Sequence, residues 1–398
     1  MTLSATVLNH VHRQPSIGGL TVLHLTQPDD GGVGRVVEQL VRAQVLAGLR
    51  VAVACPPDGP LAPAAARHGA SVHPWHAVRA PGPLLVRETA QVREVVRRVR
   101  PDLVHAHSAK AGLAGRLAVR GRIPTVFQPH AWSFEAVEGT VAALAKLWER
   151  QAARWSDRVV CVSDAERRTG ERAGITARWT VVRNGVDLTH HRPGPAEEAR
   201  AALPVVRNLP AGTLLVVCAG RLCRQKGQDV LLRAWDTVTA RFPDARLVLV
   251  GDGPEDSELR ATAGPSVLFA GHAADTAPWY RAADLVVLPS RWEGMALAPL
   301  EAMACGRPVV VTDTDGARES LPPGHDTYCL VPREEPGALA RALVRLLGEG
   351  QLRATLGRQA QDHARTAYDV RHTAEAVTKL YRELLGLPQA ECRERITR

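Results

Sequence analysis

Short apolar runs alternate along the first half of the chain with longer stretches in which apolar residues recur every three or four positions. Each short run predicts a buried β-strand, and the spacing between the runs predicts amphipathic helices, as in GRVVEQLVRAQVLAG (34–48). Such alternation is typical of parallel sheets with helices on both faces. The strands expected in this half are TVLHLT (21–26), LRVAVAC (49–55), DLVHAH (102–107), PTVFQ (124–128) and DRVVCVS (157–163).

The alternation restarts in the second half. Between the halves, RNGVDLTHHRPGP (183–195) interrupts it with Asn, Gly and Pro and is interpreted as a linker. A last amphipathic stretch, AEAVTKLYRELLG (374–386), predicts a helix. The strands expected in this half are TLLVVCAG (213–220), ARLVLVGDG (245–253), SVLFAG (266–271), DLVVLPS (284–290) and RPVVVTD (307–313).

The pattern therefore predicts two Rossmann-like, doubly wound domains, which suits a chain of 398 residues. We expect a flexible N-terminus (1–18), an N-terminal domain (19–190) and a C-terminal domain (191–370). A C-terminal helix within 371–390 is expected to pack back on the N-terminal domain. Because open α/β sheets bind ligands beyond the carboxyl ends of their strands, a ligand is expected between the domains.

The charge balance narrows the partners only slightly. The net charge is +9 and the pI is about 9.6, which suits nucleic acid, anionic lipid or a phosphorylated small molecule. A solvated basic surface explains the charge equally well. No arginine-rich tail or aromatic-basic stripe is present, so no nucleic-acid partner is expected.

Cysteine usage and hydropathy bear on the compartment. The seven cysteines are scattered without the spacing of a zinc site and are predicted to be inert core thiols in a reducing compartment. Residues 1–18 lack the apolar stretch of a signal peptide, and no run approaches the ~20 apolar residues of a membrane helix. We therefore expect a cytoplasmic protein whose membrane contact, if any, is peripheral.

The first candidate site is the glycine group Gly31, Gly32 and Gly34, between the first strand and a helix. Glycines there let a phosphate approach a helix N-terminus, although an ordinary tight turn explains them equally well. The group is not a dinucleotide fingerprint, because Val37 stands where a further glycine would fall. A nicotinamide oxidoreductase is therefore disfavoured.

The second candidate is GRLCRQKG (220–227), directly after an expected strand. Its cations Arg221 and Lys226 can neutralise a diphosphate, and an arginine can bind one bidentately. Surface Arg and Lys are common, so this segment alone does not define a site.

The third candidate is SRWEGMALAPLEAMACGRPVVVTD (290–313), which holds two carboxylates separated by seven residues. Glu293 follows an apolar strand, and Glu301 lies in the helix whose first turn suits Pro299. The two carboxylates are expected to face one cleft from different elements, although a carboxylate near a helix start can also simply complement the dipole. The loop amides that can meet a phosphate at this helix start are those of Gly294, Met295, Ala296 and Leu297.

With these motifs the sequence resembles glycosyltransferase family 4, the retaining transferases of GT-B fold, over about residues 21–385. ADLVVLPSRWEGMALAPLEAMACGRPVV follows the family's signature, GRLCRQKG its phosphate-binding segment, and RNGVD its interdomain loop. VHAHSAKAGLAGRLA and PHAWSF resemble the N-terminal domain of members that extend lipid-linked or cell-surface glycans.

The resemblance implies that the N-terminal domain (19–190) binds the acceptor and the C-terminal domain (191–370) binds the nucleotide sugar. It also implies roles for the C-terminal candidates. Glu301 would hold the nucleotide ribose, and Glu293 would contact the donor sugar or its reacting face. Arg221 and Lys226 would neutralise the leaving diphosphate, so neither a metal nor another cofactor is expected.

The resemblance also implies roles in the N-terminal domain. His130 would approach the donor sugar, and Gly32 would lie near the phosphates or the acceptor, with Gly34 beside it. His105 and His107 are weaker candidates, because residues that follow a strand so closely can simply pack.

The sequence departs from the family pattern at two places. Met295 and Ala296 replace the usual Phe-Gly, and Asp315 precedes Gly316 where two glycines are common. The triplet from Asp313 to Asp315 mimics the metal-binding motif of another transferase fold and is interpreted as a coincidental loop.

The expected function is transfer of a hexosyl group from a nucleoside diphosphate sugar, UDP foremost, to a glycan, lipid-linked or small-molecule acceptor, with retention. The alternatives are a nucleotide-sugar epimerase of GT-B fold and a non-catalytic nucleotide-sugar-binding partner in a glycan assembly complex. The basic stretch VREVVRRVR (92–100) and the net charge suggest contact with anionic lipid, and a solvated helix face is the alternative.

Overall fold

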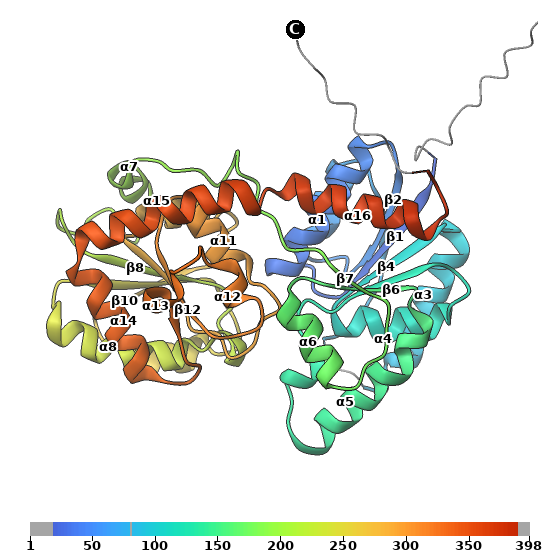
Figure 1. Ribbon diagram of the computed structural model, residues 1–398, viewed down its shortest axis with the longest axis horizontal. Helices are drawn as coiled ribbons and strands as arrows, with labels where there is room; N and C mark the ends of the chain where they lie inside the picture. Colours follow the sequence, from blue (N-terminus) through green and yellow to red (C-terminus); the bar gives the residue numbers. More distant parts are fainter. Residues whose placement is uncertain (1–18, 80–81, 389–398) are drawn as a thin grey trace, which may run out of the picture.

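The computed structural model describes residues 19–79 and 82–388 as two α/β units, each built on one parallel sheet (Figure 1). The predicted two-domain α/β architecture is confirmed. The flexibility predicted for residues 1–18 and the last two residues of the predicted 371–390 segment lie outside the described residues.

The N-terminal sheet has seven parallel strands in the order β3-β2-β1-β4-β5-β6-β7. Because the order reverses between β1 and β4, a crevice opens at the carboxyl ends of these two strands. The strands are β1 Thr21–Thr26, β2 Arg50–Cys55, β3 Ser71–Pro74, β4 Leu103–His107, β5 Thr125–Gln128, β6 Arg158–Cys161 and β7 Trp179–Val181. The helices are α1 Gly31–Leu46, α2 Leu61–Arg67, α3 Leu85–Val99, α4 Ser108–Val119, α5 Gly139–Ala152 and α6 Asp164–Arg172, with 3-10 turns η1 Ser133–Glu135 and η2 Ala153–Trp155.

The C-terminal sheet repeats this arrangement with six strands in the order β10-β9-β8-β11-β12-β13, and its reversal lies between β8 and β11. The strands are β8 Leu215–Ala219, β9 Arg246–Val250, β10 Val267–Gly271, β11 Leu285–Leu288, β12 Val309–Thr312 and β13 Leu330–Val331. The helices are α7 Ala196–Ala202, α8 Gln228–Arg241, α9 Asp256–Thr262, α10 Ala277–Ala282, α11 Leu297–Ala304, α12 Ala317–Ser320, α13 Asp326–Cys329, α14 Pro336–Gly348, α15 Gly350–Ala367 and α16 Val370–Leu384, with the 3-10 turn η3 Arg224–Lys226.

Successive strand residues point to opposite faces of the N-terminal sheet, and helices cover both faces. Leu23 and Leu25 of β1 pack towards α3 and α4, whereas Val22 packs towards α1 and α16. The side towards α1 and α16 also holds His24, His105 and His107, which are all fully buried. A polar layer therefore lies inside an otherwise apolar interface.

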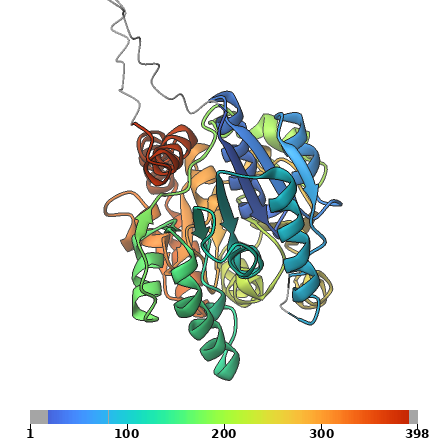
Figure 2. The ribbon, with the colours of Figure 1, turned by 90° about the vertical axis from the view of Figure 1, so that its right-hand side faces the viewer.

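Two segments cross between the units and bind each other. Val186 donates its backbone N–H to Tyr368 O at 2.7 Å, and Val370 donates to Val186 O at 3.1 Å. Gly185 is required there, because a methyl group on it would lie 2.5 Å from Val370 Cα. After this crossing α16 packs against α1 and runs alongside the N-terminal unit (Figures 1 and 2).

Candidate functional site

The predicted glycines begin α1, whose first turn meets the first turn of α11 from the other unit. A methyl group on Gly32 would lie 4.0 Å from Leu297 Cδ1. Gly34 has a different reason to be glycine, because a methyl group there would lie 2.7 Å from the backbone oxygen of Asp29. Two helix N-termini, each with partial positive charge, therefore lie together at the boundary between the units.

Glu301 lies inside α11 and is only 2% exposed. Its carboxylate forms an ion pair with Arg35 of α1 at 2.9 Å and accepts from the Tyr280 hydroxyl at 3.1 Å. The Thr276 hydroxyl lies 3.4 Å from the same carboxylate. Arg35 was not predicted, because one arginine on an amphipathic helix carries no distinguishing spacing. Through this pair the predicted ribose-binding carboxylate ties the two units together.

Lys226 and Glu293, from motifs far apart in the sequence, form an ion pair. The Ser290 hydroxyl donates to the same Glu293 oxygen at 2.8 Å. Gly227 permits this approach, since its φ is 65° and a methyl group on it would lie 2.2 Å from Pro289 O. The carboxyl ends of β8 and β11 are thus joined by a cation and a carboxylate in direct contact.

Arg221 is exposed and lies near Arg79, which follows β3 in the other unit. Burial, and then the charge of Arg221, lowers the pKa of Arg79, while Asp30 at the start of α1 opposes this effect. Two positive charges close enough to influence each other across the boundary favour an anion near them. Arg79 lies in a loop without any motif, so the sequence did not single it out.

The loop after β11 packs against the N-terminal unit. The Ser163 hydroxyl donates to Gly294 O at 2.9 Å, and the Asn184 amide donates to Met295 O at 2.7 Å. A methyl group on Gly294 would lie 2.8 Å from Glu166 Oε1, so only glycine fits without a shift. The predicted donor loop is therefore held by the opposite unit.

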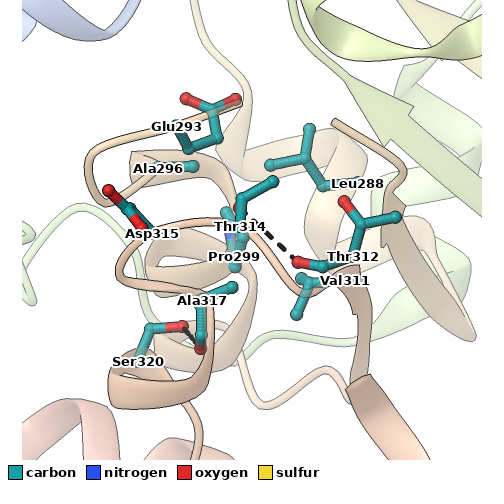
Figure 3. A pocket seen from close by; sticks show the side chains of 10 residues that line it. All are labelled: Leu288, Glu293, Ala296, Pro299, Val311, Thr312, Thr314, Asp315, Ala317 and Ser320. Atoms are coloured by element: carbon teal, nitrogen blue, oxygen red, sulfur yellow. Dashed lines mark hydrogen bonds between the residues drawn. The ribbon is translucent and has the colours of Figure 1, made fainter. Parts of the chain in front are cut away.

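A small pocket lies under this loop, with about 10 Å³ of space, close to what one water molecule needs. Ala296, Glu293 and Asp315 belong to its wall, on which Thr314 donates to Thr312 O at 3.5 Å (Figure 3). The pocket is too small for a sugar nucleotide, so a ligand would lie outside it, between the units.

Carboxyl groups also gather at the boundary beside the loop. Burial raises the pKa of Glu166 to about 8, and burial together with the charge of Asp315 raises that of Glu135 to about 7. Burial likewise raises the pKa of Asp315, whereas Asp313 pairs with Arg318 at 3.2 Å. The two aspartates of the predicted coincidental loop therefore have different neighbours.

His130 follows β5 in a strained turn, with φ of 58° at His130 and 125° at Ala131. The Glu166 carboxylate accepts from Ala131 N at 2.7 Å and holds this turn against the Gly294 loop. His130 Nε2 lies 3.0 Å from His107 Nδ1, so His107 does more than pack. Burial lowers the pKa of His130 to about 3, which leaves the imidazole neutral at pH 7.

The structure thus brings together residues from both predicted domains at one boundary. Those in contact across it are Gly32, Arg35, Gly294, Met295, Leu297 and Glu301. Glu293 pairs with Lys226 within the C-terminal unit, and Arg79, Arg221 and His130 lie beside this group. Gly34 is needed for the close packing of its own turn against Asp29, and Ala296 lies in the pocket wall.

Two family comparisons together cover most of the chain. The family described as Glycosyltransferase Family 4 matches residues 30–190, and Glycosyl transferases group 1 matches residues 213–349. Among curated relatives, D-inositol 3-phosphate glycosyltransferase of Saccharomonospora viridis is 34% identical over 317 residues, which are 72% of this chain and 70% of that protein. The enzyme of the same name from Mycobacterium bovis is 33% identical over 320 residues, 74% of this chain and 64% of that protein.

Solved structures share the whole fold. HepE of Anabaena in complex with UDP-glucose superposes with a TM-score of 0.78 at 26% identity, covering 92% of this chain and 100% of that one. Sucrose-phosphate synthase of Thermosynechococcus elongatus has a TM-score of 0.78 at 24% identity, covering 92% and 99%. The likeness to sucrose-phosphate synthase shows the fold alone.

Proposed function

Since this chain belongs to glycosyltransferase family 4 and is a glycosyltransferase of GT-B fold, we propose that it transfers a hexosyl group from a UDP-sugar with retention at the anomeric carbon. The observation that carries this proposal is the pairing of Lys226 with Glu293, directly before the loop that contacts the N-terminal unit. The cations Arg221 and Arg79 and the buried Glu301 lie at the same boundary. Cations suit a diphosphate, and a buried carboxylate suits the ribose hydroxyls.

UDP is favoured as the nucleotide because HepE, with the same fold, was solved with UDP-glucose. The acceptor is a glycan, a lipid-linked glycan or a small molecule. The relatives named D-inositol 3-phosphate glycosyltransferases support testing a phosphorylated polyol first, and the net charge of +9 suits an anionic acceptor.

In the proposed mechanism the acceptor attacks on the face that the diphosphate leaves, and the departing phosphate takes the acceptor proton. Lys226, Arg221 and the amides of the α11 start would stabilise the negative charge as it develops on the diphosphate. Glu293, whose carboxylate is already paired with Lys226, would orient that ammonium and the sugar rather than attack the anomeric carbon. Contact between the two units would exclude water.

Two other functions remain to be distinguished by experiment. A nucleotide-sugar epimerase would consume the donor without an acceptor, and a non-catalytic binding partner would bind the donor without turnover. A thermal-shift panel of UDP-, GDP- and ADP-sugars, followed by UDP release with and without acceptors, separates all three. UDP release that requires an acceptor supports transfer, and a changed sugar without an acceptor contradicts it.

Transfer is expected to survive EDTA with little change in rate. Arg79, Arg221 and Lys226 would supply the positive charge that a divalent cation gives in other transferases. UDP release measured before and after exhaustive chelation checks this expectation. Loss of activity that Mn²⁺ or Mg²⁺ restores would contradict it and assign a role to Asp313 and Asp315.

Peripheral membrane binding is proposed for the N-terminal unit, and α5 supports it better than the predicted stretch 92–100. On α3, Arg97 and Arg98 both pair with Glu94, which reduces the free charge. By contrast α5, at the lower end of Figure 2, exposes an apolar stripe made of Val141 (55%), Leu144 (66%) and Leu147 (51%). Within residues 19–79 and 82–388 no helix has the length and apolarity needed to cross a membrane.

Replacing Leu144 with Glu is expected to lower binding to anionic vesicles several-fold. The change removes apolar area that would be buried in the membrane, and it adds a negative charge that the anionic lipid repels. Liposome flotation at low salt, with neutral vesicles for comparison, measures this. Val86→Glu, at an exposed position of α3, is the matched control. Equal recovery with neutral and anionic vesicles would contradict membrane binding.

A further inference from the structure

A chain of hydrogen bonds runs through the buried polar layer of the N-terminal unit and ends at His130. His24 Nε2 lies 2.8 Å from Gln44 Oε1, and His24 Nδ1 lies 2.9 Å from His107 Nε2. His107 Nδ1 then lies 3.0 Å from His130 Nε2. The chain therefore connects the middle of α1 to the boundary between the units through three imidazole rings.

Sheet register brings these rings together. In the parallel pair β1 and β4, His24 is opposite His105 and Thr26 is opposite His107. Alternation along the strands sends His24, His105 and His107 to the same face, under α1 and α16. The rings of His24 and His107 stack with centroids 5.2 Å apart, and those of His107 and His130 stack at 5.3 Å.

All three rings in the chain are neutral at pH 7. Burial lowers the pKa of His24 to about 4 and that of His130 to about 3, and burial lowers the pKa of His107 well below its usual value. A neutral imidazole has one N–H donor and one acceptor nitrogen. Consecutive rings must therefore all be oriented the same way, and the group at the buried end decides which way.

That end is the carbonyl oxygen of Gln44, which can only accept. Oε1 is the Gln44 atom that contacts the chain, and the Gln44 amide nitrogen has no hydrogen-bond partner among the described residues. His24 then carries its proton on Nε2 and accepts at Nδ1, and the same assignment passes to His107 and to His130.

We infer that Gln44, His24 and His107 are positioning residues that fix His130 as the Nε2–H tautomer, so that its Nδ1 faces the donor sugar as a hydrogen-bond acceptor. Within residues 19–79 and 82–388, no side chain or backbone group hydrogen-bonds with this Nδ1. An acceptor nitrogen binds a sugar hydroxyl and repels a carboxylate. This inference rests on the proposed function and deepens it, since it assigns a neutral hexose donor rather than a uronate.

A metal ion is the competing explanation for the cluster. Ring nitrogens of His24, His105 and His107 all lie within 4.8 Å of one another. However, His24 and His107 are hydrogen-bonded to each other at 2.9 Å, and a metal bound through those two nitrogens would have to displace the proton between them.

The test is the tautomer of His130 in the full-length protein with ¹⁵N-labelled histidine rings. Long-range ¹H–¹⁵N spectra, assigned with His130→Gln, are expected to show the proton on Nε2. Gln44→Met keeps the side-chain shape but removes the terminal acceptor, so the His130 signals are expected to shift towards a mixture. With UDP-glucose, kcat/KM is expected to fall about 2- to 10-fold, the loss of one hydrogen bond, and the preference over UDP-glucuronate to narrow.

The matched control is His105→Phe, in the same buried layer but outside the chain, where the ring meets Tyr381 at 2.6 Å. It is expected to change melting temperature while leaving the His130 tautomer and the donor preference unchanged. A proton on His130 Nδ1 in the unchanged protein, or the same tautomer in Gln44→Met, overturns the inference. So does a stoichiometric zinc ion in the purified protein. The expected spectra without any UDP-sugar turnover would instead support the chain and overturn the proposed function.

Discussion

Lys226→Ala is expected to lower turnover by about 10²–10³ while the protein stays folded. The negative charge that develops on the diphosphate needs a fixed counter-charge, and Lys226 is held in place by Glu293. Only 19% of the Lys226 side chain is exposed, so water screens this charge less than it screens a surface lysine. Steady-state UDP release, with circular dichroism to confirm folding, measures the effect.

The control is Arg224→Ala, in the same 3-10 turn. Arg224 pairs with Glu138 at 3.0 Å, but the two side chains are 60% and 83% exposed, and such a pair contributes little. Because Lys226→Ala also leaves Glu293 without its cation, the double variant Lys226→Ala/Glu293→Gln separates loss of the charge from the cost of a buried, unpaired carboxylate. Near-native turnover in Lys226→Ala would remove the proposed phosphate role.

Glu301→Ala is expected to weaken UDP binding by about 10- to 150-fold, the ~1.5–3 kcal/mol typical of hydrogen bonds to a charged group. The carboxylate is buried and already positioned by Tyr280 at 3.1 Å, so it can hold ribose hydroxyls without further ordering. The fold should survive, because Arg35, which loses its partner, has 36% of its side chain exposed. Isothermal titration calorimetry with UDP measures the change.

Asp256→Ala is the matched control in the same unit, since Asp256 pairs with Arg260 at 2.8 Å on the surface. UDP affinity equal to that of the unchanged protein in a folded Glu301→Ala variant would show that the ribose is held elsewhere. A variant of Arg35 gives a second measurement of UDP affinity. A bound nucleotide must either displace Arg35 from Glu301 or bind with this ion pair in place.

Much of the fold could be predicted from local patterns. Strands in the middle of a parallel sheet are buried on both faces, so each appears as a continuous apolar run between helical stretches. Three strands were not predicted, namely β3 Ser71–Pro74, β7 Trp179–Val181 and β13 Leu330–Val331. They lie at the sheet edges and are short, and β3 and β7 are mostly half-buried, so their residues form no apolar run.

Some residues of the candidate site could likewise be predicted from the sequence, and others only from the structure. By itself the sequence predicted Glu293, Glu301, Arg221 and Lys226 as candidates, because each lies in a short motif at the end of an expected strand. Tertiary structure alone decided what these groups face: Arg35 on Glu301, Arg79 beside Arg221, and Gln44 behind the histidines. Those partners come from amphipathic helices and an irregular loop, where no local pattern distinguishes them, and only packing between distant segments selects them.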